Sequence, residues 1–301
     1  MKFWKNPARA LLSMLQEKLP PTVQTHQFLS VSLDRDVRLD VYLPPNYDLR
    51  KRRLYPFVLF NDGQDLPRMH SKEVSGFQVS EVSGFRAILE ALYEVEEIPP
   101  IIAVGVYTSS ERIREYGTAQ QADYKGRGDK AGSYNTFIVS ELLPFLFRQY
   151  RLSDLPEDCA IAGFSLGGLS AFDIGWANQD IFGTIGVFSG ALWWRSSHVN
   201  PEDPDADRIM HDIVQQTVFV NKDQYFWFQC GTLDEEDDRN NNGVIDSIDD
   251  TLALIKVIQS KGFRDASIRY LEIEEGRHDP ETWGKAMGDF LRWAFVEEGD
   301  I

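Results

Sequence analysis

The sequence of 301 residues predicts an α/β protein with a mainly parallel central sheet, an antiparallel hairpin near its N-terminus, and helices on both faces of the sheet. Two observations support this prediction. Short runs that are apolar throughout alternate with segments that have helical spacing, and such runs are typical of parallel strands covered on both faces. No internal repeat, low-complexity linker or shift in composition marks a boundary between domains.

Residues 1–24 are expected to form an amphipathic helical arm ahead of a main domain at residues 25–301. The segment "MKFWKNPARALLSMLQEKLPP" contains basic residues, and its apolar residues have the spacing of one face of a helix. It lacks the continuous apolar stretch of a secretory signal. No run in the chain is long enough to span a bilayer, so we expect a cytoplasmic protein.

The main domain begins with two alternating segments, His26–Leu33 and Val37–Leu43, which flank "DRD" and predict a β-hairpin. The apolar runs that follow predict the strands of the sheet: "YPFVLFND", "PIIAVGVY", "CAIAGFS", "TIGVFSG", "YFWFQCG" and "SIRYLEI". Helical spacing between them predicts helices at Phe85–Val95, Tyr134–Phe147, Leu166–Ala177 and Thr251–Lys261.

Two connections, Thr108–Ser133 and the acidic segment after Cys230, are longer than ordinary crossovers. Long loops in compact domains are commonly functional. Both leave the carboxyl ends of predicted parallel strands, which is the edge where open α/β sheets bind ligands.

The net charge of −16 argues against nucleic acid or an anionic membrane surface as a partner, because both would repel the protein. Cys159 and Cys230 each lie inside an apolar run and are expected to be buried thiols. The sequence does not indicate an oligomeric state.

The run "CAIAGFSLGGLSAFDIGWA" predicts a strand, a sharp turn and a helix, with Ser165 at the turn. In a G-x-S-x-G turn of this kind the serine hydroxyl is raised above the sheet as a nucleophile. The backbone N–H of Leu166, at the start of the helix, can then stabilise an oxyanion. A glycine-rich turn with only a structural role is the alternative.

A serine nucleophile needs a base, and His278 is the histidine that follows the last predicted strand, in the chain order Ser, acid, His. Asp234 lies just beyond the run "YFWFQCG" and is the preferred acid, which would accept a hydrogen bond from the imidazole. Glu235 and Asp279 remain alternatives for this role.

The motifs "GFSLGG", "GTLD", "GRHDPETW" and "VLFNDGQD" resemble those of the putative esterase family of α/β-hydrolases. The resemblance extends from about residue 25 to residue 296. That family includes enterochelin esterases, S-formylglutathione hydrolases, feruloyl esterases and mycolyltransferases. The resemblance implies the α/β-hydrolase fold and a Ser-His-acid mechanism. It also implies that "DGQD" supplies a second oxyanion N–H, from Gln64 or Asp65.

Candidates for substrate binding come from two segments. "SERIREYGTAQQADYKGRG" is similar to the substrate loop of the enterochelin-esterase branch, so Arg112 and Arg114 are candidates for binding an anionic ligand. Trp193 and Trp194 follow a strand on the same edge and are candidates for packing an aryl or acyl group. The alternatives are solvated arginines and tryptophans that belong to the core.

The segment "DRNNNGVIDSID" at residues 238–249 matches the template of a calcium loop and is predicted to be an insertion in the main domain. Gly243 occupies position 6, where the template needs a tight turn. The predicted ligands occupy positions 1, 3, 5, 7, 9 and 12: Asp238, Asn240, Asn242, the Val244 carbonyl, Asp246 and Asp249. We expect calcium in a structural role and no organic cofactor.

Together these features predict a serine esterase that hydrolyses a small-molecule carboxylic ester through an acyl-enzyme, with a siderophore-like or aryl ester as substrate. One alternative is an acyltransferase that uses the same residues. The other is a non-catalytic scaffold that binds a ligand or a partner.

Overall fold

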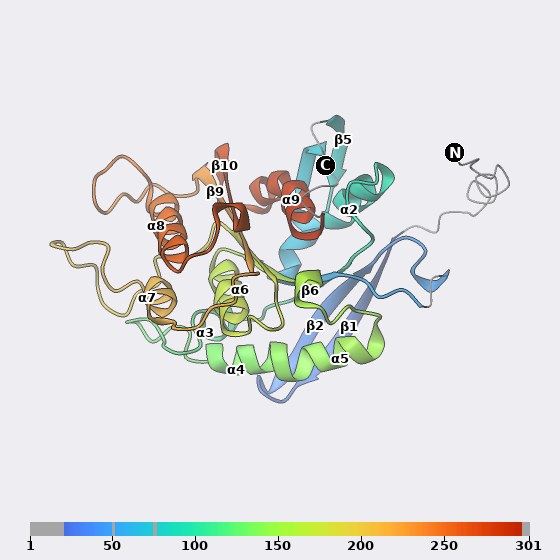
Figure 1. Ribbon diagram of the computed structural model, residues 1–301, viewed down its shortest axis with the longest axis horizontal. Helices are drawn as coiled ribbons and strands as arrows, with labels where there is room; N and C mark the ends of the chain where they lie inside the picture. The colour runs from blue at the N-terminus through green and yellow to red at the C-terminus, as the bar shows by residue number, and fades with distance from the viewer. Residues whose placement is uncertain (1–20, 50–51, 75–76, 297–301) are drawn as a thin grey trace, which may run out of the picture.

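The computed structural model describes residues 21–49, 52–74 and 77–296. Eight strands in this part of the chain form one sheet in the order β1-β2-β6-β3-β7-β8-β9-β10 (Figure 1). Their bounds are β1 Thr22–Ser30, β2 Arg35–Leu43, β3 Phe57–Asn61, β6 Ile102–Val106, β7 Cys159–Phe164, β8 Thr184–Phe188, β9 Tyr225–Leu233 and β10 Ile268–Arg277. In this sheet β2 pairs antiparallel with both β1 and β6. All the other neighbouring strands in it pair parallel.

Most helices lie between strands along the chain, and α9 follows the last strand. Their bounds are α2 Phe85–Glu94, α3 Arg112–Glu115, α4 Ala131–Thr136, α5 Leu143–Gln149, α6 Leu166–Ala177, α7 Ile209–Gln216, α8 Asp246–Ser260 and α9 Pro280–Phe295. A π-helical segment at Phe137–Leu142 joins α4 to α5, and 3-10 turns occupy Tyr47–Leu49, Gly63–Arg68, Pro156–Asp158 and Asp265–Ser267. None of the described helices is long and apolar enough to cross a membrane.

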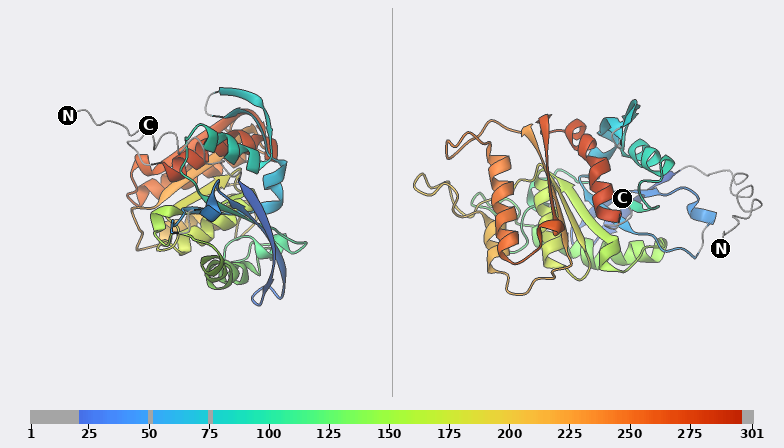
Figure 2. Two further views of the ribbon diagram at one scale, coloured as in Figure 1. Left: turned by 90° about the vertical axis from the view of Figure 1, so that its right-hand side faces the viewer. Right: turned by 45° about the horizontal axis from the view of Figure 1, so that its top comes forward.

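The fold is the predicted α/β-hydrolase fold, a mostly parallel sheet with an antiparallel N-terminal hairpin and helices on both faces (Figures 1 and 2). The predicted hairpin corresponds to β1 and β2. A small separate sheet of β4 His70–Val74 and β5 Phe77–Ser83 was not predicted. The proposed arm at residues 1–24 lies largely outside the described residues, and its last three residues belong to β1.

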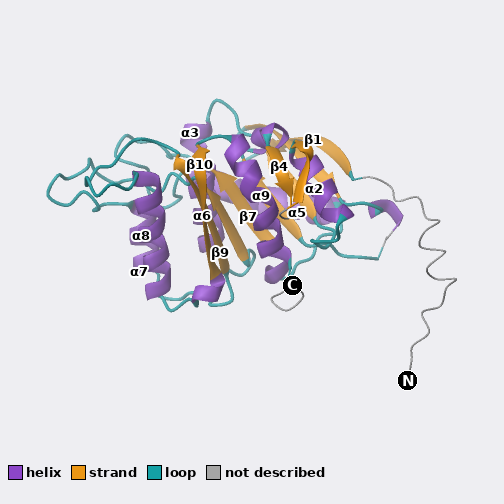
Figure 3. Ribbon diagram, turned by 90° about the horizontal axis from the view of Figure 1, so that it is seen from above, coloured by secondary structure: helices purple, strands orange, loops and turns teal. Residues whose placement is uncertain are grey.

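Two apolar cores hold the helices against the sheet. On one face, Phe60, Phe164 and Phe188 of the strands pack with Phe85 of α2 and Phe290 of α9. On the other face a larger core joins the strands to α4, α5, α6, α7 and α8. Helices α7 and α8 lie side by side near the end of the sheet that β10 closes (Figure 3). Cys159 and Cys230 are buried free thiols, as predicted.

The parallel strands bring distant residues to one edge of the sheet. Asp62 directly follows β3, Ser165 follows β7, Ser189 follows β8, Asp234 follows β9 and His278 follows β10. Because the carboxyl ends of parallel strands meet at one edge, residues separated by more than 200 positions in the chain become neighbours there. A functional site is therefore expected at this edge.

Candidate active site

Ser165 forms the turn between β7 and α6 in a strained backbone conformation, with φ 56° and ψ −124°. Positive φ is unfavourable for a residue with a side chain, and it persists only where the surroundings hold it. The Ser165 N–H donates to the Phe188 carbonyl at 2.8 Å, and the Ser165 carbonyl accepts from Gly168 at 3.0 Å and Ala191 at 3.1 Å. The neighbouring strand and the helix start thus fix the serine in this turn.

The two flanking glycines of the motif are required by close packing. A Cβ on Gly163 would lie 2.2 Å from the Gly167 carbonyl oxygen. A Cβ on Gly167 would lie 2.3 Å from the Asp62 carboxylate. The first glycine therefore lets the helix backbone approach the strand, and the second makes room for a buried acid after β3.

The predicted oxyanion donors lie in two segments beside the turn. Leu166 is the first residue of α6, where no backbone carbonyl of the helix can accept its N–H. The Asp65 N–H donates to the Asp62 carbonyl at 2.9 Å, so it is already used within its own turn. This leaves Gln64 as the better of the two candidates in "DGQD". The Gln64 side chain bonds the Asp62 carboxylate at 3.0 Å and the Thr108 N–H at 3.2 Å.

His278 and Asp234 approach each other from the ends of β10 and β9. The distance from His278 Nδ1 to Asp234 Oδ1 is 3.9 Å, which is longer than a hydrogen bond. The Asp234 side chain is fully buried, and its other oxygen accepts from the Gly231 N–H at 3.0 Å. Catalytic hydrogen bonds are often long in the absence of substrate and tighten in the complex. The pair is thus close enough to form the bond after a small shift.

Burial changes the pKa of both groups. It lowers the pKa of His278, and the positive charge of Arg112 lowers it further, while Asp234 opposes the shift. Burial raises the pKa of the Asp234 carboxyl, although the Gly231 N–H and the Ser189 hydroxyl act in the opposite direction. The imidazole is therefore uncharged near neutral pH, which is the form that can accept a proton.

The other two candidate acids have different surroundings. Asp279 caps the start of α9, where its carboxylate accepts from the Thr282 N–H at 2.9 Å. Burial raises the pKa of Glu235 to about 7, and its carboxyl interacts with the Ser247 backbone at the start of α8. Among the three candidates, Asp234 is the one with an oxygen facing His278 within 4 Å.

An ion pair between Arg112 and Asp62 lies beneath the serine turn. Arg112 binds the fully buried Asp62 carboxylate through two hydrogen bonds of 2.7 and 2.6 Å. The same guanidinium approaches the Phe164 carbonyl at 3.4 Å, one residue before Ser165. The sequence analysis missed Asp62, which lies in the left-handed region with φ 59°. The available signal was its place directly after a buried strand.

Arg114, the second predicted arginine, lies on the surface. Its guanidinium bonds Asp129 and Glu111, and its side chain is about half exposed. These contacts place it in a surface ion-pair network, and no contact joins it to the residues of the triad among those described.

The predicted tryptophans differ from each other. Trp194 is fully buried and lies against Gly117 and Gly128, so it anchors the long 108–133 loop. Trp193 is partly buried, and the Arg127 guanidinium lies 5.1 Å from the centre of its ring. The long loop and the segment after β8 therefore pack together at the edge that carries Ser165.

The predicted calcium loop brings several of its side chains together. The side-chain amides of Asn240 and Asn242 both donate to Asp249 Oδ2, at 3.1 and 2.7 Å. Asp238 accepts from the Asn242 and Gly243 N–H groups. Gly243 has φ 85°, as the template requires at position 6.

The rest of the loop fits the template less closely. Asp246 Oδ1 accepts from the Arg239 N–H at 3.0 Å, whereas the Val244 N–H donates to Asn242 at 2.8 Å. In the described part of the chain no three His, Cys, Asp or Glu side chains are grouped as metal ligands. The template takes some ligands from amide and main-chain oxygens, so calcium binding stays a prediction.

The sequence matches a family described as "Putative esterase" over residues 30–294. Two relatives from Bacillus subtilis (strain 168) are similar to it at 24% identity. The uncharacterized protein YbbA aligns over 58% of this chain and 67% of its own length, and the uncharacterized protein YjcH over 80% and 85%.

Solved structures share the fold at low sequence identity. A ferulic acid esterase has a TM-score of 0.64 at 18% identity, covering 92% of this chain and 99% of its own. The enterobactin esterase of Shigella flexneri has a TM-score of 0.68 at 17% identity, covering 93% and 61%. The BES protein of Bacillus cereus has a TM-score of 0.61 at 17% identity, covering 94% and 98%.

Proposed function

The chain belongs to the putative esterase family, and from this premise we propose that it is a serine hydrolase that cleaves carboxylic esters with Ser165, His278 and Asp234. The observation that carries the proposal is the strained Ser165 turn at the start of a helix. His278 and Asp234 follow neighbouring strands of the same sheet edge, in the order expected of a hydrolase.

In the proposed reaction His278 accepts the hydroxyl proton of Ser165 as the serine oxygen attacks the ester carbonyl. The tetrahedral intermediate collapses, the alcohol leaves with a proton from His278, and an acyl-enzyme remains on Ser165. Water then attacks the acyl group with His278 again as base, which releases the acid and restores the serine. Asp234 stabilises the imidazolium that forms in each half of the reaction.

The N–H groups of Leu166 and Gln64 are proposed to bind the oxyanion. Leu166 directly follows Ser165, and Gln64 lies two residues after Asp62, whose carboxylate packs against Gly167 of the serine turn. Donors fixed in advance beside a nucleophile stabilise the developing negative charge without reorganisation. The start of α6 also directs the positive end of the helix dipole toward this charge.

For the substrate we propose an ester with an aryl or anionic group. The support is Arg112, which lies against the serine turn with about one third of its side chain exposed, and the partly buried Trp193. Esters of aryl or siderophore type match this chemistry, and the solved structures of similar fold include a ferulic acid esterase and an enterobactin esterase. Acyl transfer to an alcohol by the same residues remains the second candidate reaction.

We also propose that the 238–249 loop binds calcium as a structural ion. The support is that Asp249 accepts from the side-chain amides of Asn240 and Asn242, while Asp238 accepts from the Asn242 backbone N–H. When bound, the ion would neutralise these carboxylates and fix the loop near Asp234.

The experiment is an assay of siderophore, hydroxycinnamoyl, thioester and simple acyl substrates, with Ser165→Ala as the blank. We expect at least one ester to be hydrolysed at a rate that the blank lowers by several orders of magnitude. Added alcohol distinguishes the two reactions, because a transferase diverts the acyl group from water. Binding of esters with no turnover of any of them would leave the non-catalytic scaffold as the better account.

A further inference from the structure

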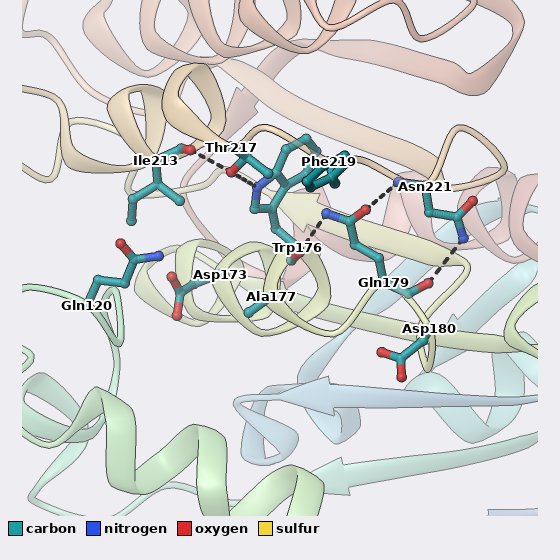
Figure 4. A pocket seen from close by; sticks show the side chains of 10 residues that line it. All are labelled: Gln120, Asp173, Trp176, Ala177, Gln179, Asp180, Ile213, Thr217, Phe219 and Asn221. Atoms are coloured by element: carbon teal, nitrogen blue, oxygen red, sulfur yellow. Dashed lines mark hydrogen bonds between the residues drawn. The ribbon is translucent and has the colours of Figure 1, made fainter.

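A hollow of about 570 Å³ lies on the outer side of α6, and none of its lining residues belongs to the triad (Figure 4). One side is formed by Gln120, Asp173 and Asp180, and the other by Ile213 and Phe219 (Figure 4). Asp173 follows Ser165 by about two turns of the same helix, or roughly 12 Å along its axis. The hollow is therefore separate from the ester site.

Asp173 is the buried carboxyl group of this hollow, and it forms no ion pair with the described residues. Its side chain is almost fully buried, with 5% of the residue exposed, and one oxygen accepts from the Ala119 N–H at 2.9 Å. The second oxygen accepts no hydrogen bond from the described residues. Burial raises the pKa of Asp173 to about 7, and no cationic side chain contributes to it. Such a carboxyl is expected to have a binding partner when it is ionised.

Four other lining residues with polar groups are paired with one another. The Trp176 indole N–H donates to the Thr217 hydroxyl at 3.0 Å, so the ring presents only its apolar surface. Gln179 and Asn221 bond each other through side chain and backbone, at 2.5 and 3.2 Å. The lining includes a second carboxylate, Asp180, and no lysine, arginine or histidine. The available charge of the hollow is thus negative.

Apolar surface surrounds this charge. Trp176 lies between the two sides of the hollow, and Phe219 at its rim is 89% exposed (Figure 4). Aromatic faces attract cations and pack against flat groups. The volume lies within the range of small-molecule sites in proteins.

We propose that this hollow is a second binding site, which takes a small organic ammonium ion joined to a flat apolar group. The ammonium group donates a hydrogen bond to the free oxygen of Asp173, while the apolar group packs against Trp176 and Phe219. The ion pair is formed in a partly dehydrated site, where a charge-assisted hydrogen bond is stronger than in water.

The test uses 2-phenylethylammonium as the probe and 2-phenylethanol as a neutral molecule of the same shape. Calorimetric titration of the wild-type protein at pH 8, where both charges are present, is expected to show binding of the ammonium at least about 10-fold tighter than that of the alcohol. The Trp176 indole N–H signal in a nitrogen–proton spectrum, assigned with Trp176→Phe, is expected to shift as the probe binds.

Two variants locate the charge. Asp173→Asn keeps an oxygen that can accept from Ala119 and is expected to weaken ammonium binding at least about 10-fold. Asp212→Asn makes the same change of net charge at an exposed position outside the lining, and is expected to bind like the wild type.

The proposal is overturned by equal binding of amine and alcohol, by an unchanged Trp176 signal, or by no binding at about 10 mM probe, a concentration that would occupy about 90% of a site with a Kd of about 1 mM. The comparison of amine with alcohol needs no variant, so it decides the question even if Asp173→Asn does not fold.

Discussion

At the scale of single residues, the pair formed by Arg112 and Asp62 has the largest expected consequences. Asp62 has no exposed side-chain surface, so its charge depends on the two hydrogen bonds from Arg112 and on Gln64. Removal of one member of a buried pair leaves an uncompensated charge, which is far more costly than the loss of a surface pair. Arg114, paired with Asp129 on the surface, offers a matched comparison.

We predict that Arg112→Gln lowers the free energy of unfolding by about 2–3 kcal/mol, the low end for a buried pair because Arg112 is partly exposed. Arg114→Gln is expected to have a much smaller effect, because its ion pairs lie on the surface and are screened by solvent. Urea unfolding of both variants measures the difference. Equal losses in the two variants would mean that Asp62 does not depend on Arg112.

The same two variants, Arg112→Gln and Arg114→Gln, are also expected to differ in their effect on the pKa of His278, the proposed base. The charge of Arg112 disfavours the imidazolium and so lowers the pKa of His278. Without that charge the pKa rises, so the acidic limb of the kcat/KM profile should move to higher pH in Arg112→Gln and stay in place in Arg114→Gln.

The sequence allowed some of these residues to be predicted and not others. Ser165 could be predicted from a local motif, and His278 from its place after the last predicted strand in the chain order Ser, acid, His. For Asp62 the one signal, its place directly after a buried strand, is weak, because "NDGQD" after a strand is equally typical of an ordinary turn. Its partner lies 50 positions away, and such pairing depends on packing of the whole sheet edge.

At the scale of elements, the 238–249 loop connects Asp234, the proposed catalytic acid, to α8. Asp234 precedes the loop by four residues, and α8 begins at Asp246, inside the template. Arg239, at position 2, bonds Asp205 and the fully buried Asp250, so the loop is also joined to the segment before α7. A displacement of the loop is therefore expected to move Asp234, which precedes it, and also the segments next to α7 and α8 that Arg239 contacts.

We predict that removal of calcium by a chelator, or Asp238→Ala, lowers the melting temperature and kcat together, and that calcium restores only the chelated wild type. Without the ion the ligand carboxylates repel one another, and a small displacement of a catalytic group can lower the rate about 100-fold. Melting curves and assays on metal-stripped protein measure both effects.

Glu236→Ala is the matched control for this experiment, because Glu236 is exposed and lies outside the template. It should leave both the melting temperature and kcat unchanged. Failure to bind calcium at millimolar concentration would remove the metal assignment, whereas binding with unchanged kcat would separate the loop from Asp234.

Elements with strong periodicity were predicted well, and those defined by tertiary contacts were not. The predicted helix at Leu166–Ala177 agrees with α6 residue for residue. Helix α8 begins five residues earlier than the predicted Thr251, because its first turn lies inside the acidic loop and lacks apolar spacing. The sequence analysis predicted no element at the β4–β5 hairpin, which pairs only within its own two-stranded sheet.

At the scale of the whole molecule, the site exists because the sheet is parallel. Ser165, Asp234 and His278 each follow a different strand. They come to one edge because these strands run parallel in the order that the sheet has. The two apolar cores hold that order by packing helices on both faces. Family membership and the solved structures agree on this architecture, while the chemistry depends on whether Ser165 is the nucleophile.

Labelling with an alkyl fluorophosphonate tests that claim most directly. Ser165 attacks phosphorus, fluoride leaves, His278 takes the proton, and a stable phosphonyl ester remains. We predict that intact mass spectrometry shows one phosphonyl group per chain and that peptide mapping places it on Ser165. Labelling should be absent in Ser165→Ala and strongly slowed in His278→Ala. A label on another residue, or undiminished labelling of Ser165→Ala, would contradict the account.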